Sequence, residues 1–537
     1  MKPELTRRGF LVGGAAASLA VPGAAPAEGP EKLGPPREVH DPAHQDHHHG
    51  GGDYPRQRPG AGGPVGSPTD RGKLVPGRRQ PGERPVPVQT PDLAKLPWEW
   101  TNGAKEFHLH CKHTRREFLP GMWFDVWGFN DSMPGPTIEA VEGDRVRIVV
   151  HNELPESTSM HWHGLEVPIA MDGVHGLTQD PIKPGATFVY EFDLHQNGTF
   201  FYHSHGPMQE GMGMAGLFII YPRAAHEPAV DHDFALLIQE WAILPQNTVP
   251  NTMSMEFNFF TLNGRSGPYT TPLVVRLGDR VRIRFVNMSA IDHHPMHLHG
   301  HTFWVTGTEG GRIPESAWLP GNNVLVGVAQ ARDVEFIANN PGDWMIHCHM
   351  FHHMMNHMTS MVGPMAGHAM TGMAGPRDTA NGMGMLTLGR GESPLGELGP
   401  ALGRGTGEQT ATDRAVRNGP GQAAGEQDRR SRVPGYPQDM MDMHGMHSAA
   451  DLKKINKPQT RGMRDGWSAG VEALMTVLRV LPPDLYDKVV SGKGDVPPGA
   501  SVPGATPGGA PGHDMHKGHE MHGESKKEDK HDAGHKH

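Results

Sequence analysis

The sequence predicts an all-β chain built from two tandem Greek-key domains of the β-barrel or β-sandwich type. One observation is an internal repeat: "VEGDRVRIVVHN" at 141–152 matches "RLGDRVRIRFVN" at 276–287, and both alternate apolar with polar residues after a Gly-Asp turn. Histidine motifs follow each copy in the same order. Turn signals are frequent between about 96 and 365, and no stretch there predicts a convincing helix. We expect the strands to pair antiparallel.

Composition limits how much of the 537-residue chain can fold around a core. Gly and Pro number 71 and 50, and hydrophobic residues make up only 36%. We therefore predict a disordered Pro/Gly/His-rich linker at 28–95, one domain at 96–225 and a second at 226–365. A low-complexity tail rich in Met and His follows at 366–537, with one short amphipathic helix at 466–490.

The N-terminus resembles a twin-arginine export signal. Arg7 and Arg8 precede a weakly apolar run, and Ala25-Pro26-Ala27 offers a cleavage site, so residues 1–27 are predicted to be removed on export, to the periplasm or an equivalent compartment. No other run is long and apolar enough to predict a membrane span. A net charge of -10 gives no electrostatic case for nucleic acid as a partner.

Four His-x-His pairs carry the first metal prediction. Residues i and i+2 of a strand point to the same face, so each pair presents two imidazoles side by side. Two pairs belong to each repeat, at matching positions, which packing alone does not explain. The pairs are His161/His163, His203/His205, His297/His299 and His347/His349.

Cys348 lies between His347 and His349, so its side chain points to the opposite face and must serve a different site. A thiolate with two imidazoles and a weak axial thioether is the ligand set of a blue copper site. His294, His353 and Met358 are the available partners. The other cysteine, Cys111, is read either as a buried free thiol or as part of a satellite metal site with His108, His110 or His113.

Four motifs together resemble the copper signatures of the multicopper oxidases: "HWHG", "HSH", "HPMHLHGH" and "HCH" followed by a His and a Met. The resemblance implies cupredoxin domains, a type 1 copper that takes electrons singly and a trinuclear cluster that reduces dioxygen to water, hence four coppers per functional unit. It assigns His294, Cys348, His353 and Met358 to the type 1 copper and His161 and His297 to the type 2 copper. The type 3 pair would be held by His163, His203, His205, His299, His347 and His349.

The spacing of the motifs is similar to that of two-domain laccases. Thr158, Ser204 and Gln209 stand where the second domain has His294, Cys348 and His353, so we predict one type 1 copper per chain, in the second domain. The resemblance implies a homotrimer with each cluster between two subunits; an intrachain cluster stays open.

The resemblance also gives Asp172 as a catalytic residue that supplies protons near the type 2 copper, while a turn before Gly173 is the plainer reading. Met354 stands where many relatives carry a second acidic residue. The expected reductant is Cu(I), in copper tolerance, because soft thioethers crowd the copper motifs and the tail. Alternatives are a laccase acting on small phenols, a copper nitrite reductase, which needs no trinuclear cluster, and a copper-sequestering protein.

Overall fold

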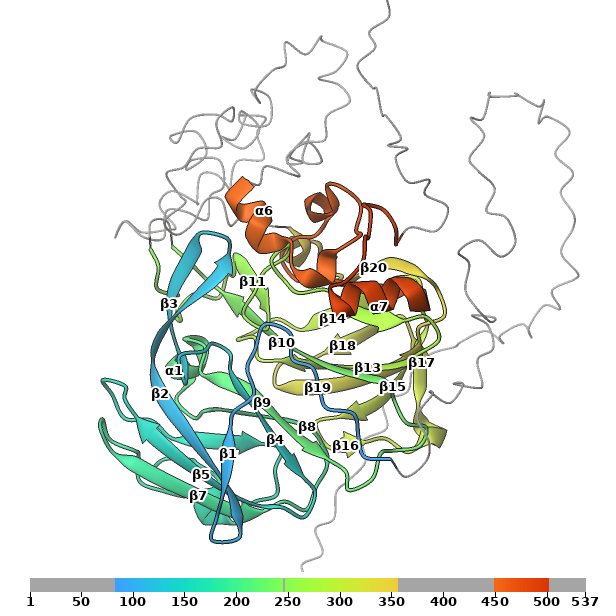
Figure 1. The fold of residues 1–537 in the computed structure, drawn as a ribbon. Helices are drawn as coiled ribbons and strands as arrows, with labels where there is room; N and C mark the ends of the chain where they lie inside the picture. Colours follow the sequence, from blue (N-terminus) through green and yellow to red (C-terminus); the bar gives the residue numbers. More distant parts are fainter. Residues whose placement is uncertain (1–82, 245–246, 356–448, 502–537) are drawn as a thin grey trace, which may run out of the picture. The chain divides into compact units, whose positions relative to one another are not determined.

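The computed structural model describes residues 83–244, 247–355 and 449–501 of the chain. Its strands form four sheets, two from each repeat (Figure 1). The predicted signal peptide, the linker up to residue 82 and most of the Met/His-rich tail lie outside the described residues. Among those described, no helix combines the length and hydropathy that a bilayer crossing requires.

The first domain contains sheets I and II. Sheet I runs in the order β1-β2-β5-β7, with β3 paired to β2, and sheet II runs β4-β9-β8-β6. Their bounds are β1 Trp98–Thr101, β2 Ala104–Leu119, β3 Met122–Phe129, β5 Arg145–Asn152 and β7 Thr187–Asp193, then β4 Gly135–Val141, β6 Met160–His163, β8 Gly198–Ser204 and β9 Ala215–Tyr221. Two short helices, η1 Ile169–Met171 and α1 Pro207–Gly211, lie in the connections.

The second domain contains sheets III and IV. Sheet III runs β11-β10-β13-β19-β15-β16, with β17 paired to β15, and sheet IV runs β12-β21-β20-β14-β18. Sheet III consists of β10 His232–Trp241, β11 Phe259–Leu262, β13 Arg280–Asn287, β15 Phe303–Thr308, β16 Gly311–Arg312, β17 Leu319–Gly321 and β19 Gln330–Ile337. Sheet IV consists of β12 Leu273–Arg276, β14 His294–Leu298, β18 Asn323–Val326, β20 Gly342–Cys348 and β21 Met475–Leu481. The helices are η2 Glu315–Ala317, η3 Phe351–Met354, α6 Ala449–Ile455, η7 Pro458–Thr460, η8 Trp467–Gly470 and α7 Pro483–Ser491.

The prediction of a two-domain all-β fold is confirmed. The expectation of purely antiparallel pairing is wrong, because each sheet contains one parallel pair: β2 with β5, β4 with β9, β10 with β13 and β12 with β21. Alternation of residue types fixes which face a strand buries but not the direction of its neighbour.

The tail prediction is wrong for residues 449–501. Strand β21 lies inside sheet IV between β12 and β20, and Leu474, Leu478 and Val480 are fully buried in the core of the second domain. The helix predicted at 466–490 is correct only for its last part, where α7 lies, and the residues before it form η8 and β21. A short apolar run such as "MTVLRVL" suits a buried strand as well as a buried helix, and its position inside a sheet decides for the strand.

The linker prediction is also wrong for residues 83–95. Gln89 and Lys95 form single bridges with Phe234 and Thr137 of the two domains. Val88 is buried in the apolar cluster where the domains meet. The segment is ordered by long-range contacts that its Pro-rich composition does not reveal.

The two copies of the repeat differ in what covers their outer face. In β5 the residues Arg145 and Arg147 are partly exposed, whereas the corresponding arginines of β13, Arg280 and Arg282, are buried. The outer face of sheet III packs against sheet II through an apolar cluster that includes Phe201, Leu217, Leu237 and Val286. The same sequence pattern therefore gives a solvated face in one domain and an internal face in the other.

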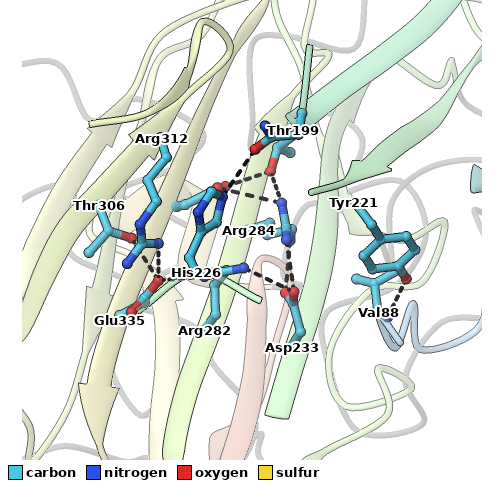
Figure 2. Close-up of polar contacts among 12 residues, drawn as sticks. Val88, Thr199, Tyr221, His226, Asp233, Arg282, Arg284, Thr306, Arg312 and Glu335 are labelled. Carbon is cyan, nitrogen blue, oxygen red and sulfur yellow. Dashed lines mark hydrogen bonds and ion pairs between the residues drawn. The ribbon is translucent and has the colours of Figure 1, made fainter. Parts of the chain in front are cut away.

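Ion pairs compensate the buried arginines (Figure 2). Glu335 accepts hydrogen bonds from Arg280 at 2.7 Å, Arg282 at 2.7 Å and Arg312 at 2.6 Å. Asp233 pairs with both Arg282 and Arg284. Burial alone would raise the pKa of Glu335, but Arg282, Arg312 and Arg280 hold that pKa well below its usual range.

Candidate metal centres

The first histidine quartet lies on sheet II. Because β6 and β8 pair antiparallel with His161 opposite His203, two His-x-His motifs come together on the face that carries Phe201. The ring of His161 lies 5.3 Å from that of His203 and 5.7 Å from those of His163 and His205. Ligand atoms of His161, His163 and His203 lie within 4.8 Å of one another, close enough to hold a metal ion.

Oxygen acceptors orient these rings. The Nδ1–H of His161 donates to the carbonyl of Asp172 at 2.8 Å, and that of His203 donates to the carbonyl of Ser204 at 2.9 Å. Each bond leaves Nε2 free to act as a ligand. Burial lowers the pKa of His163 to about 4 and that of His203 to about 3, so both are neutral, the form that binds metals.

The second quartet lies on the outer face of sheet IV. Strand β14 pairs with β20 so that His297 faces His347, and the ring of His297 lies 4.8 Å from that of His299 and 5.6 Å from that of His349. The Nε2 atoms of His299 and His347 are 3.0 Å apart. The ligand atoms of His297, His299 and His347 lie within 4.8 Å of one another. This group can also hold a metal.

The third group lies on the core side of sheet IV. Cys348 Sγ is 3.6 Å from Nδ1 of both His294 and His353, and these two nitrogens are 3.2 Å apart. All three side chains are buried. Cys348 lies in the core cluster together with Ile346, two residues before it on β20, as strand alternation predicts.

The donor set of this third group fits copper. Burial raises the pKa of the Cys348 thiol to about 12 and lowers that of His294 to about 3. A buried thiol of this kind ionises when a cation binds it, and a thiolate with two imidazoles suits copper. Ser289 Oγ contacts His294 Nε2 at 2.7 Å, which leaves Nδ1 for the metal. The predicted axial ligand, Met358, lies outside the described residues.

The segment that leads into β21 also supports this site. Cys348 donates its backbone N–H to the carbonyl of Leu474 at 3.1 Å, and Leu474 donates its own N–H to the carbonyl of His353 at 3.0 Å. One residue next to β21 therefore fixes the backbone of two candidate ligands through its N–H and its carbonyl. The sequence carries no local signal for this contact, because more than a hundred residues separate the partners.

The first domain has a neutral hydrogen-bonded group at the equivalent position. Gln209 Oε1 accepts hydrogen bonds from Thr158 Oγ1 at 2.7 Å and Ser204 Oγ at 2.6 Å, and all three side chains are buried. None of them is a thiolate or an imidazole. The arrangement supports the prediction of a single site of this kind, in the second domain.

Acidic side chains lie beside candidate ligands in both domains. Asp172 Oδ1 lies 3.5 Å from His161 Nδ1. The next residue, Gly173, has φ +89°, and a Cβ at this position would collide with the Met160 carbonyl. Glycine therefore lets this turn approach β6. Sequence reasoning missed Glu210, whose carboxylate lies 3.4 Å from His203 Nδ1 and whose pKa burial raises to about 7. It also missed Asp292, 3.4 Å from His353 Nε2. Both contacts depend on how a loop folds back.

Cys111 is not part of a metal group with its histidine neighbours. It is fully buried in the core of the first domain, and burial raises the pKa of its thiol. His108 and His110 lie on the opposite face of β2. Cys111 and Cys348 are both free, so the reading as a buried free thiol agrees with the structure.

The two quartets occupy different faces. The first lies where sheet II meets sheet III, and the second lies on the outer side of sheet IV, beyond the core of the second domain. Every ring contact of the eight histidines, all of them in the described chain, joins members of one quartet or a neighbouring Phe. Each quartet by itself contains half of the paired histidines that the sequence predicts as copper ligands.

Comparison with known proteins gives matches in both domains. Residues 110–225 and 243–364 match two family models, each described as multicopper oxidase. Copper resistance protein A of Escherichia coli is 37% identical over 134 residues, which are 25% of this chain and 22% of that protein. Laccase-1 of Cryptococcus neoformans var. grubii is 33% identical over 224 residues, 35% of each chain. The chain thus spans well under half the length of these curated relatives. A solved blue copper oxidase from Nitrosomonas europaea is 32% identical, with 47% of this chain and 81% of that one covered and a TM-score of 0.44.

Proposed function

This chain belongs to the multicopper oxidase family, and on that premise we propose that it couples one-electron oxidation of a reductant to the four-electron reduction of dioxygen to water. The observation that carries the proposal is the coexistence of three ligand groups, one with a cysteine thiol and two made only of imidazoles. A nitrite reductase would not need two complete quartets, and a storage protein would not need a buried thiol site linked to one of them.

Different groups of residues would hold different coppers. His294, Cys348 and His353, with Met358, would hold the type 1 copper; His161 and His297 the type 2 copper; and the remaining six paired histidines the type 3 coppers. Copper bound in these groups supplies one-electron acceptance at the first site and multi-electron transfer to dioxygen at the cluster. Cys348 adjoins His347 and His349 in the chain. A covalent path therefore runs from the thiol through the backbone to either of these two members of the second quartet.

The trinuclear cluster, on this proposal, forms between subunits of a homotrimer. Its support is that the two quartets lie on different faces of the chain, so the first quartet of one copy would meet the second quartet of another. Heterologous contacts of this kind form a ring when the rotation between neighbouring copies closes, as it would in a trimer.

Subunit mixing tests this assembly. His163→Ala disables the first quartet and His299→Ala the second, so each variant alone should fail to reduce dioxygen. In a mixed trimer one of the three interfaces would join two intact quartets, because the ring contains one contact of each direction between unlike subunits. Oxygen uptake should therefore recover when the two variants are refolded or expressed together. No recovery, with mixed trimers verified by mass, would favour an intrachain cluster.

Cu(I) is the proposed reductant, in copper tolerance. The similarity to copper resistance protein A supports it, as do the methionines of 356–448 and 502–537, outside the described residues. Among the described residues the support is weaker, since Met354 packs with Met463 and Met475 in an apolar cluster. Phenol oxidation is the second candidate, favoured by the similarity to a laccase.

Steady-state oxygen uptake with Cu(I) and with 2,6-dimethoxyphenol separates the two. The informative variant deletes 366–440 and 502–537 but keeps 449–501, because β21 is part of sheet IV. If the tails collect Cu(I), this variant should lose Cu(I) oxidation at low copper and keep phenol oxidation. Equal losses of both activities, or no loss of either, would refute a role of the tails in Cu(I) delivery and favour a general laccase.

Two further parts of the proposal rest on single features. Asp172 would pass protons toward dioxygen, and its support is the contact with His161. Export through the twin-arginine pathway to the periplasm is supported by the arginine pair near the N-terminus. The double variant Arg7→Lys/Arg8→Lys should leave unprocessed protein in the cytoplasm. Asp172→Asn should slow dioxygen reduction without loss of copper.

A further inference from the structure

Three histidines that the copper centres do not use lie together on the exposed face of sheet I. His108 and His110 come from β2 and His151 from β5. The two strands pair in parallel with His110 opposite His151, and the core side of both strands is apolar. The register therefore places three imidazoles on one solvent-facing patch, and none of the three belongs to a copper motif.

The nitrogens of two of these rings already face each other. His108 Nδ1 lies 3.0 Å from His151 Nε2. Two nitrogens bound to one ion at bond lengths of about 2.0–2.1 Å are separated by roughly 2.9–3.4 Å for angles between square-planar and tetrahedral. The observed separation falls in that interval, so an ion could replace the proton that one of the two nitrogens otherwise carries.

Oxygen acceptors hold the outer nitrogens of both rings. His108 Nε2 lies 3.3 Å from Glu106 Oε1, and His151 Nδ1 lies 3.1 Å from Thr187 Oγ1. When both outer nitrogens are donors, both inner nitrogens present lone pairs to the same point. A carboxylate behind a ligating imidazole is the usual outer partner in such sites.

A third imidazole is within reach. The ring of His110 stacks on that of His151 at 4.4 Å, and its Nδ1 lies 2.7 Å from Glu153 Oε1. Burial, followed by the neighbouring His110 and His108, lowers the pKa of His151, which favours its neutral, ligating form. Side chains of His108 and His110 are 53% and 37% exposed, so an ion can enter from solvent.

We propose that His108 and His151, with His110 as a third ligand after a side-chain rotation, bind one divalent first-row transition ion, Cu(II) foremost. Imidazole ligands suit Cu(II), and the affinity order of divalent ions favours it. The site is separate from the three copper groups and includes neither cysteine. It does not depend on the proposed oxidase activity.

Metal counting on the full-length, copper-loaded protein tests the site. Wild type, His108→Gln/His151→Gln and the control His113→Gln are dialysed against buffered Cu(II), and bound copper per chain is measured by mass spectrometry. His113 is an exposed histidine of the same strand next to Asp125, so it controls for any single surface imidazole. The double variant should lose one tightly held ion per chain, and the control should lose none.

A second variant keeps the test decisive if the double variant folds poorly. Glu106→Gln removes only the outer carboxylate and should weaken binding of that ion by about 10- to 100-fold. Unchanged blue absorption in each variant reports that the type 1 site is intact. Equal copper content in wild type and the double variant, an equal loss in His113→Gln, or unchanged affinity in Glu106→Gln would each overturn the proposal.

Discussion

Removal of β21 should unfold the second domain, although this strand lies more than a hundred residues beyond the rest of sheet IV. Three fully buried side chains illustrate the scale: Leu474, Leu478 and Val480. Burial of one such side chain contributes about 1.5–3 kcal/mol, so these three contribute roughly 5–9 kcal/mol. That is comparable with the whole stability of a typical domain, about 5–15 kcal/mol. A chain that ends at residue 448 also loses Leu474, whose carbonyl and N–H bind the backbone of Cys348 and His353.

The assay compares three purified proteins by thermal unfolding and by the intensity of the blue absorption. The chain ending at 448 should give no blue protein with a cooperative transition, whereas the chain ending at 501 should behave like the full length. Leu478→Ala should cost about 2–5 kcal/mol, or roughly 5–15 °C in Tm. Leu452→Ala, on the exposed side of α6, should change stability by less than about 0.5 kcal/mol. Normal colour and cooperative unfolding in the chain ending at 448 would refute the role given to β21.

Three other predictions follow from the sites and the buried charges. Cys348→Ser should abolish the blue absorption, which needs the copper–thiolate bond, and leave the trinuclear copper bound; Cys111→Ala should stay blue, and a blue Cys348→Ser protein would disprove the assignment. His163→Ala should do the reverse, with the blue colour retained while oxygen uptake collapses, and unimpaired uptake would exclude His163 as a ligand. Glu335→Gln should cost about 3–5 kcal/mol by leaving buried arginines unpaired. The pKa of Glu335 is lower in the folded than in the unfolded chain, so its contribution is full above about pH 4.3 and is lost as the pH falls below that value. Urea titrations at pH 7 and pH 3 should therefore show a smaller difference between wild type and variant at pH 3, and an equal difference would contradict the ion-pair account.

Much of the site could be predicted from the sequence because its geometry is local. A strand has a period of two, so a His-x-His pair must present both rings on one face, and a cysteine between two histidines must point the other way. The repeated order of motifs gave two similar domains. The replacement of His294, Cys348 and His353 by Thr158, Ser204 and Gln209 placed the thiol site in the second domain only. Each of these inferences needs only residue types and spacings within a few positions.

Tertiary structure decided the features that depend on partners distant in the chain. Arg145 and Arg280 occupy matching positions of the repeat, yet only Arg280 is buried, because sheet III is covered by the first domain and sheet I is not. Glu210 reaches His203 through the turn of α1, and His151 meets His108 through a parallel pairing. The segment at 475–481 becomes a strand because sheet IV offers it a place between two others. An apolar run records that it must be buried, but the surface that buries it belongs to another part of the chain, and so its structure is settled only when the whole domain folds.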